Sequence, residues 1–190
     1  MGRSVRQSAI KLWGVKIDFI YSLFPQFFWE DARILDVGAG TGEKGLINFI
    51  SRGVKSSNCF AIDAVNRMAL LELAGCNCVI MNLQKEKISD RIGGSFDVII
   101  CSHFLEHVTQ RCEDSLLEQF SKIGSNVVIC YPTRPMMKKG KKKKPFGHQR
   151  TPDGERIVEN LSLYFDQVTA EEINYQIFIV ARGNKSECKN

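Results

Sequence analysis

The chain lacks three features that would assign it to a broad class: a CxxC pair, a long apolar run and the apolar core of a signal peptide. Its seven cysteines, an odd number, mostly lie in apolar runs typical of strands. This predicts reduced thiols and argues against a disulfide framework or cysteine-held zinc. No apolar run approaches the roughly 18 residues of a membrane span. The 190 residues and 44% hydrophobic content fit one domain with a full core, which we expect in the cytoplasm.

Charge is unevenly distributed along the chain. The formal net charge is +5, and six lysines within seven positions contribute +6, so the rest of the chain carries −1. These are Lys138, Lys139, Lys141, Lys142, Lys143 and Lys144. Like charges so close repel one another, and phosphate groups would neutralise them, which predicts contact with RNA or another phosphate-rich partner. A solvated loop or a signal resembling those for nuclear import fits the same run.

Short apolar runs alternate with helical patterns. The runs expected as strands cover residues 33–37, 58–63, 76–81, 96–101 and 126–131, and the expected helices cover 43–51, 66–73, 84–91, 104–123 and 153–162, the last capped by Thr151 with Pro152 as its first residue. This alternation predicts a parallel sheet with helices on both faces. Two further runs, 164–169 and 173–181, are joined by a link too short for a crossover helix, so we expect them to pair antiparallel.

The first apolar run ends in Asp36 and continues into glycines at every second position, Gly38, Gly40 and Gly42. This pattern predicts a strand that turns sharply into a helix, with positive φ angles at some of the glycines. Side chains at these positions would occupy the space of a ligand, so the bare backbone predicts a nucleotide-like ligand against the turn. Gly40, Gly42 and Gly45 also fit G-x-G-x-x-G. That match alone is weak, and the acid at Asp36 favours a cationic or amino-bearing ligand over a dinucleotide.

Two later runs end in groups that suit the rest of a nucleoside. Asp63 ends the second run, where its carboxylate can accept hydrogen bonds from both hydroxyls of a ribose. Asn82 and Leu83 follow the third run and can meet an adenine edge. Together with the fourth run, which follows Ser95, these motifs resemble the class I S-adenosylmethionine-dependent methyltransferases over residues 30–182.

The resemblance implies a Rossmann-like α/β fold, with a seven-stranded, mostly parallel sheet whose last strand is antiparallel. It also implies that S-adenosyl-L-methionine is the cofactor. The implied binding residues are Asp36, Gly38, Ala39, Gly40 and Gly42 at the methionine part, Asp63 and Ala64 at the ribose, Asn82 and Leu83 at the adenine, and Ser102 completing the methionine pocket. The family often has Asp where this chain has Asn82. The reaction is then in-line methyl transfer, in which proximity and orientation do most of the work.

Two of the three histidines follow the fourth run, in His103-Phe104-Leu105-Glu106-His107. In a helix that begins early enough, His103, Glu106 and His107 share one face, which we expect to line the acceptor side of the pocket. His107 and His103 are then candidate catalytic bases. The string also fits the H-x-x-E-H of zinc proteases, but that motif needs helix on both sides and here it follows a strand.

The same string is similar to the Glu-x-x-Glu-His of metal-dependent small-RNA 2′-O-methyltransferases. This weaker resemblance implies a divalent metal on His103, Glu106, His107 and His148, which would orient an acceptor hydroxyl. His103 replaces the first Glu of that pattern, which favours a softer metal than magnesium. Many methyltransferases carry Glu-His here without a metal, as polar lining.

We divide the chain into an N-terminal amphipathic helix over the pocket (1–29), a methyltransferase domain (30–182) with a basic connection (132–152), and a polar tail (183–190). The first segment is basic and has no acid before Asp18, so a mitochondrial transit peptide is the alternative. The favoured acceptor is RNA, at a hydroxyl. The alternatives are a small-molecule O- or N-methyltransferase and a non-catalytic RNA-binding or partner module.

Overall fold

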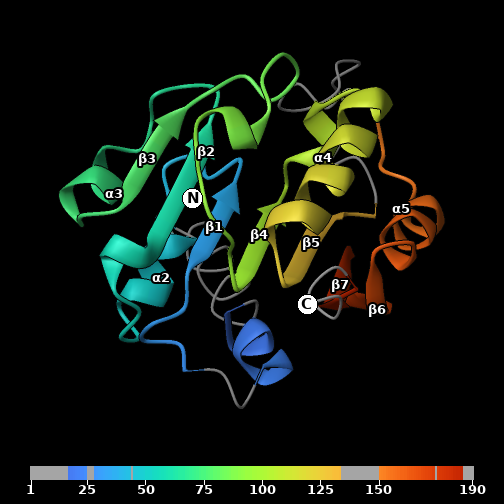
Figure 1. Ribbon diagram of the computed structural model, residues 1–190, viewed down its shortest axis with the longest axis horizontal. Coiled ribbons are helices and arrows are strands. Elements are labelled where there is room, and N and C mark those ends of the chain that lie inside the picture. The colour runs from blue at the N-terminus through green and yellow to red at the C-terminus, as the bar shows by residue number, and fades with distance from the viewer. Residues whose placement is uncertain (1–16, 25–27, 44, 134–149, 174, 186–190) are drawn as a thin grey trace, which may run out of the picture.

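The computed structural model describes residues 17–24, 28–43, 45–133, 150–173 and 175–185 (Figure 1). The six lysines at 138–144, His148 and the first sixteen residues lie outside this part of the chain. Predictions about RNA contact, the fourth metal ligand and the start of the N-terminal helix therefore remain predictions.

Seven strands form one sheet in the order β3-β2-β1-β4-β5-β7-β6 (Figure 1). The strands are β1 (Ile34–Val37), β2 (Cys59–Asp63), β3 (Asn77–Ile80), β4 (Val98–Ser102), β5 (Asn126–Pro132), β6 (Phe165–Ile173) and β7 (Gln176–Asn184). The first five pair in parallel, and β7 pairs antiparallel with both β5 and β6. The predicted Rossmann-like sheet is confirmed.

Helices cover both faces of the sheet because its central strands are apolar on both sides. In β1, Leu35 and Val37 join a core beneath α4 (Gln110–Ile123) and α5 (Gly154–Ser162). Ile34 joins the opposite core, beneath α2 (Leu46–Ile50), α3 (Ala69–Leu73) and the helical residues 17–23. Within the part of the chain described, no helix is long and apolar enough to cross a membrane.

The helix predicted over residues 104–123 is broken. A 3₁₀ turn covers Leu105–His107, and Val108 is extended, with φ −115° and ψ 160°. The helix proper begins at Gln110 because Thr109 caps it, its hydroxyl accepting a hydrogen bond from the Cys112 N–H (3.3 Å). Of the two histidines expected on one helix face, His107 therefore lies in a tight turn and His103 precedes that turn.

Three smaller expectations also need correction. The segment 84–91 contains only a 3₁₀ turn at Ile88–Asp90. The cap of α5 is Asp153, whose carboxylate accepts from the Arg156 N–H, and not Thr151. Strand β7 extends to the buried Asn184, whose amide donates to the Gly124 carbonyl (2.9 Å), so the fold reaches into the segment expected as a tail.

Candidate functional site

The glycine turn after β1 has the predicted backbone. Gly38, Gly40 and Gly42 have φ angles of 77°, 59° and 71°, which L-residues rarely adopt. Their surroundings differ, however. A Cβ at Gly38 would lie 2.5 Å from Phe104, and one at Gly42 would lie 2.3 Å from Leu71, whereas one at Gly40 would enter open space. Of the three, Gly38 and Gly42 let neighbouring side chains pack and Gly40 borders open space, while contact of all three with a ligand stays a prediction.

Asp63 at the end of β2 holds this turn in place. One carboxylate oxygen accepts from the Gly40 N–H (2.9 Å) and the other accepts from the Val65 N–H (2.9 Å). Each oxygen keeps a second lone pair, so the carboxylate can still accept from a ribose hydroxyl. The turn is also tied to β2 by the N–H of Ala39, which donates to the Ile62 carbonyl (3.0 Å).

Asp36 is a buried carboxylate at the base of the turn, 5% exposed. Burial, and then the charge of Asp63, raises its pKa to about 7. A Cβ at Gly45 would lie 2.3 Å from the Asp36 Oδ2 atom, so Gly45 makes room for this carboxylate, a role that the sequence match did not suggest. No ion pair of Asp36 occurs in the described structure, and a cationic group of a ligand would stabilise its ionised form.

The segment after β3 lies beside Asp63, since the Met81 N–H donates to the Asp63 carbonyl (3.0 Å). Asn82 follows, and its side-chain oxygen accepts from the Gln84 N–H (3.0 Å) in a local turn. The side chain keeps its amide N–H groups and the second lone pair of its oxygen for the predicted contact with an adenine ring. Leu83 is 8% exposed and its carbonyl accepts from the Cys112 thiol (3.3 Å).

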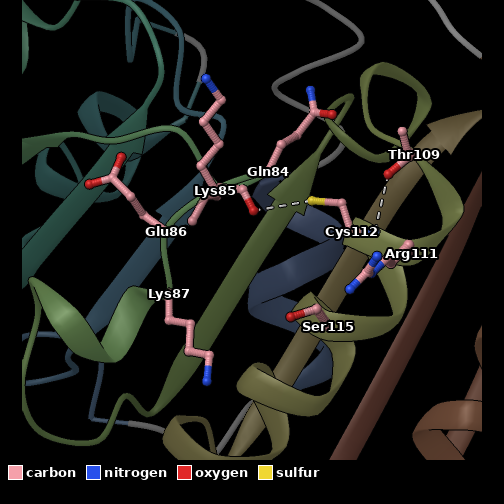
Figure 2. Close-up of a pocket in the computed structure, with 9 residues that line it drawn as sticks. Gln84, Lys85, Glu86, Lys87, Thr109, Arg111, Cys112 and Ser115 are labelled. Carbon is pink, nitrogen blue, oxygen red and sulfur yellow. Dashed lines mark hydrogen bonds between the residues drawn. The ribbon is translucent and has the colours of Figure 1, made fainter.

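A cavity of about 440 Å³ lies between this segment and the first turn of α4 (Figure 2). It is lined by Leu83, Gln84, Lys85, Glu86, Lys87, Thr109, Arg111, Cys112 and Ser115. Sequence reasoning did not find the α4 contribution, because it placed these residues in the middle of a longer helix.

His103, which we expect on the acceptor side, immediately follows β4. It has a positive φ of 55°, and its N–H donates to the Cys130 carbonyl at the end of β5 (2.7 Å). Its Nδ1 atom lies 3.3 Å from a carboxylate oxygen of Glu106, which is 1% exposed. Neither Glu106 oxygen makes a hydrogen bond within the described residues, and the same holds for the buried hydroxyl of Ser102. Buried polar groups without partners often mark functional sites.

The predicted metal set is not assembled by the residues that the structure describes. Among them, no three His, Cys, Asp or Glu side chains form a group that could hold a metal ion. His103 and Glu106 are brought together, His107 lies one residue further along the same 3₁₀ turn, and His148 lies outside the described residues. Ala64 is exposed beside Asp63.

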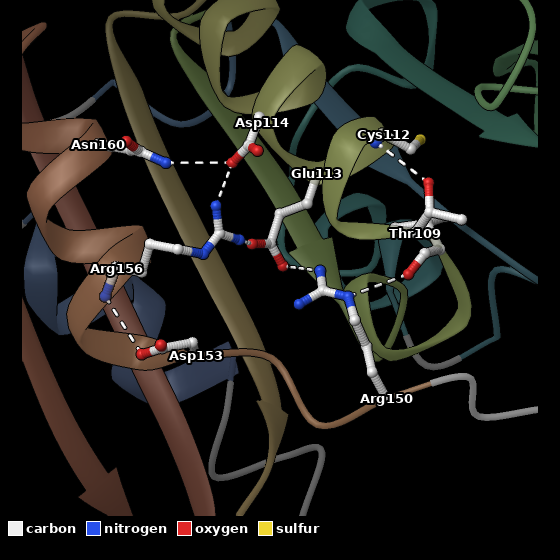
Figure 3. Close-up of polar contacts among 9 residues, drawn as sticks. Thr109, Cys112, Glu113, Asp114, Arg150, Asp153, Arg156 and Asn160 are labelled. Carbon is white, nitrogen blue, oxygen red and sulfur yellow. Dashed lines mark hydrogen bonds and ion pairs between the residues drawn. The ribbon is translucent and has the colours of Figure 1, made fainter.

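A buried ion cluster supports this acceptor-side turn (Figure 3). Glu113 on α4 is fully buried and pairs with both Arg150 and Arg156. Arg150 also donates through Nε to the Val108 carbonyl (3.1 Å) and through its N–H to the Glu106 carbonyl (3.4 Å). The sequence did not predict this ion cluster. One signal was present, because Glu113 interrupts the apolar face of α4 and a buried acid needs a cation as its partner.

These features fit a sulfonium nucleoside. Gly40 borders open space, Asp63 offers lone pairs to a diol, and Asp36 favours a cation. The three groups lie at the carboxyl ends of β1 and β2, where open α/β sheets bind ligands.

Comparison with known proteins also indicates a methyltransferase. The sequence matches a family model described as methyltransferase domain over residues 12–164. The fold is similar to the N-terminal domain of EvdMO1 with SAH bound (TM-score 0.66, 16% identity, covering 90% of this chain and 81% of that one). It is also similar to the magnesium protoporphyrin IX methyltransferase ChlM from Synechocystis with bound SAH (0.65, 13%, 96% and 89%).

A third similar structure is the PH0226 protein from Pyrococcus horikoshii (0.66, 13%, 90% and 91%). No curated protein matches the sequence significantly. The chain belongs to the methyltransferase-domain family and has its class I fold, which confirms the S-adenosylmethionine-dependent methyltransferase predicted from the sequence.

Proposed function

We propose that this methyltransferase methylates an acceptor hydroxyl, with His103 as the base. The observation that carries the proposal is the pairing of His103 Nδ1 with the buried Glu106 carboxylate, 3.3 Å away, directly after β4. This contact has an ion-pair distance and not hydrogen-bond geometry, and the negative charge of Glu106 favours a proton on Nδ1, which leaves Nε2 as the proton-accepting atom. S-adenosylmethionine supplies an electrophilic methyl group on a good leaving group, so the protein's main tasks are orientation and proton removal.

The backbone position of His103 supports this role. Its N–H donates to the Cys130 carbonyl of β5, and the residue directly follows β4, so its backbone lies at the carboxyl end of these two neighbouring strands. His107, in the same turn, is the alternative base. The proton of the acceptor hydroxyl goes to the histidine as the oxygen attacks the methyl carbon, and the thioether product leaves.

A small molecule is the first candidate acceptor. Exposed carboxylates line the part of the acceptor side where β5, α5 and β6 meet, and they would repel a polyanion such as RNA. One similar structure is a magnesium protoporphyrin IX methyltransferase, and another, from Burkholderia thailandensis, is described as an O-methyltransferase family protein (TM-score 0.63, 13% identity, covering 94% of this chain and 58% of that one).

RNA is the second candidate, favoured by the six lysines between Thr133 and Arg150. These two flanking residues lie at the acceptor side. Thr133 donates through its N–H to the Tyr175 carbonyl (2.9 Å), and Arg150 donates to the Glu106 carbonyl. The lysines lie between these two residues in the sequence, and phosphate contacts would make RNA binding strongly dependent on salt.

A labelled methyl-transfer assay on fractionated cell extract tests both candidates. With the wild-type protein we expect the labelled methyl group in the small-molecule fraction. His103→Gln should lose most of this labelling, and His107→Gln should lose less. The pH at which the rate rises should change in His103→Gln only. Label in RNA that disappears when the six lysines are replaced by serine would favour the second candidate. Equal activity of wild type and His103→Gln would contradict the role of His103.

A further inference from the structure

A second cavity, of about 530 Å³, lies at the same edge of the sheet as the donor site. It is bounded by the end of β5, the start of α5, the second half of β6 and the start of β7. Its polar lining includes Tyr131, Thr133, Thr151, Asp153, Glu155 and Glu172. Tyr131 follows Cys130, whose carbonyl accepts from the His103 N–H. The cavity is therefore one residue along β5 from the contact that fixes the proposed base.

Tyr131 gives this cavity an unsatisfied polar group. The residue is 2% exposed, and its hydroxyl is buried without a hydrogen-bond partner in the described structure. A Cβ at Gly154 would lie 2.7 Å from this hydroxyl, so the glycine at the start of α5 makes room for it. Burying a hydroxyl without a partner is costly, and a ligand in the cavity would supply the missing hydrogen bond.

Burial, and then the charge of Asp153, raises the pKa of Tyr131 to about 12. The phenol is therefore neutral at ordinary pH and can both donate and accept a hydrogen bond. Its oxygen can accept a hydrogen bond from a ligand N–H, while its O–H keeps its proton.

The charge of the lining has one sign. Asp153, Glu155 and Glu172 are exposed carboxylates, and neither Lys nor Arg is among the described residues that line the cavity. Only Asp153 has an assigned local role, as the cap of α5. An anionic ligand would be repelled here and a cation attracted.

We propose that this cavity binds the protonated amine of a small-molecule acceptor, with the Tyr131 oxygen accepting from the ammonium group and Glu155 and Glu172 supplying the counter-charge. The inference rests on the proposed function, since it names the class of molecule that the hydroxyl methylation serves. The acceptor then carries both a hydroxyl, which reaches His103, and an amine, which determines its orientation.

Ligand-observed NMR on the full chain tests this with small primary amines, each matched to the alcohol and the carboxylate of the same skeleton, such as benzylamine, benzyl alcohol and benzoate. We expect each amine to bind roughly five- to tenfold more tightly than its alcohol, which is what two exposed charge pairs supply, and the carboxylates to bind least. Tyr131→Phe, which removes only the hydroxyl, should weaken amine binding by a similar factor.

Two double variants of equal charge provide the control. Glu155→Gln with Glu172→Gln changes the lining, whereas Glu159→Gln with Glu171→Gln changes exposed neighbours on the same helix and strand that do not line the cavity. The first should abolish the preference for amines and the second should preserve it. Equal binding of amines and alcohols by wild type, or equal effects of both pairs, would overturn the proposal.

Binding of S-adenosylmethionine, measured in the same samples, distinguishes failure of the amine site from failure of the proposed methyl transfer. If the donor binds and the amine preference is absent, the cavity assignment is wrong while methyl transfer stands. If the donor does not bind at all, the proposed function fails first.

Discussion

At the residue scale, Gly40 and Gly42 share a backbone conformation and differ in what surrounds them. Positive φ angles cost an L-residue roughly 1–2 kcal/mol at either position. At Gly42 the added methyl would also collide with Leu71, whereas at Gly40 it would occupy the space in which we expect the donor. We therefore expect Gly42 to serve mainly packing and Gly40 to serve donor binding.

We expect Gly42→Ala to lower the free energy of unfolding by about 3 kcal/mol, because strain and overpacking add. Gly40→Ala should lose only about 1 kcal/mol and should weaken S-adenosylmethionine binding more strongly. Urea unfolding and donor titration of both variants measure this. Equal stability losses would show that the difference in packing has no energetic consequence.

Asp36 makes the stability of the free protein depend on pH. Its pKa is raised by folding to about 7, so the folded state holds the proton more tightly than the unfolded chain. Stability then falls as the pH rises from about 4 to about 7, by up to about 4 kcal/mol. Donor binding should strengthen over the same range, because a cation favours the ionised carboxylate.

Asp36→Asn should remove this decline. At about pH 8 the variant should be more stable than the free wild type, while binding S-adenosylmethionine more weakly. Urea unfolding at about pH 5 and pH 8 provides the measurement, with Asp166→Asn, exposed on β6, as the control that keeps the wild-type slope. A wild-type protein whose stability is flat across this range would refute the argument.

At the scale of elements, the ion cluster on Glu113 joins α4, α5 and the turn after β4 (Figure 3). Removing the charge leaves two largely buried guanidinium groups without their partner, which is the costly way to break a buried pair. Each arginine side chain is about one-fifth exposed, which moderates the cost.

We expect Glu113→Gln to lower the free energy of unfolding by about 3 kcal/mol and to reduce methyl transfer through the displaced turn. Donor affinity should be almost unchanged, because we expect the donor to bind mainly at the ends of β1 and β2. Glu118→Gln on the exposed side of the same helix is the matched variant and should have little effect on stability. If both variants are equally stable, the ion cluster does not stabilise the packing of α4 against α5 and the turn after β4.

Sequence reasoning found the strands and their direction but missed this cluster, for a physical reason. The period of apolar residues locates a strand or a helix face, and glycines and acids at strand ends locate a ligand. The break at Val108 and the pairing of Glu113 with Arg150 depend on contacts between segments far apart in the sequence. His103 and Glu106 were recognised as a set, but their geometry comes from a 3₁₀ turn that the helical pattern did not predict.

At the scale of the whole molecule, donor binding and folding are linked. A ligand at about one hundred times its dissociation constant adds about 2.7 kcal/mol to the stability of a protein that binds it only when folded. For a chain of this length, that corresponds to a rise in melting temperature of about 5–10 °C.

Asp63→Asn, which retains one acceptor oxygen for the turn, should show a much smaller rise, and Asp63→Ala almost none. Thermal unfolding with and without S-adenosylmethionine is the measurement. A full shift in Asp63→Ala would remove this carboxylate from the donor site, and no shift in wild type would favour the non-catalytic module.

The contacts of Thr133 and Arg150 also bear on how the acceptor side could change in evolution. Each is fixed to a different part of the fold, Thr133 on the Tyr175 carbonyl and Arg150 on Glu113 and the Glu106 carbonyl. A change at either residue would therefore disturb the acceptor side and leave the contacts of Asp63 untouched, so we expect the choice of acceptor to evolve separately from recognition of the methyl donor.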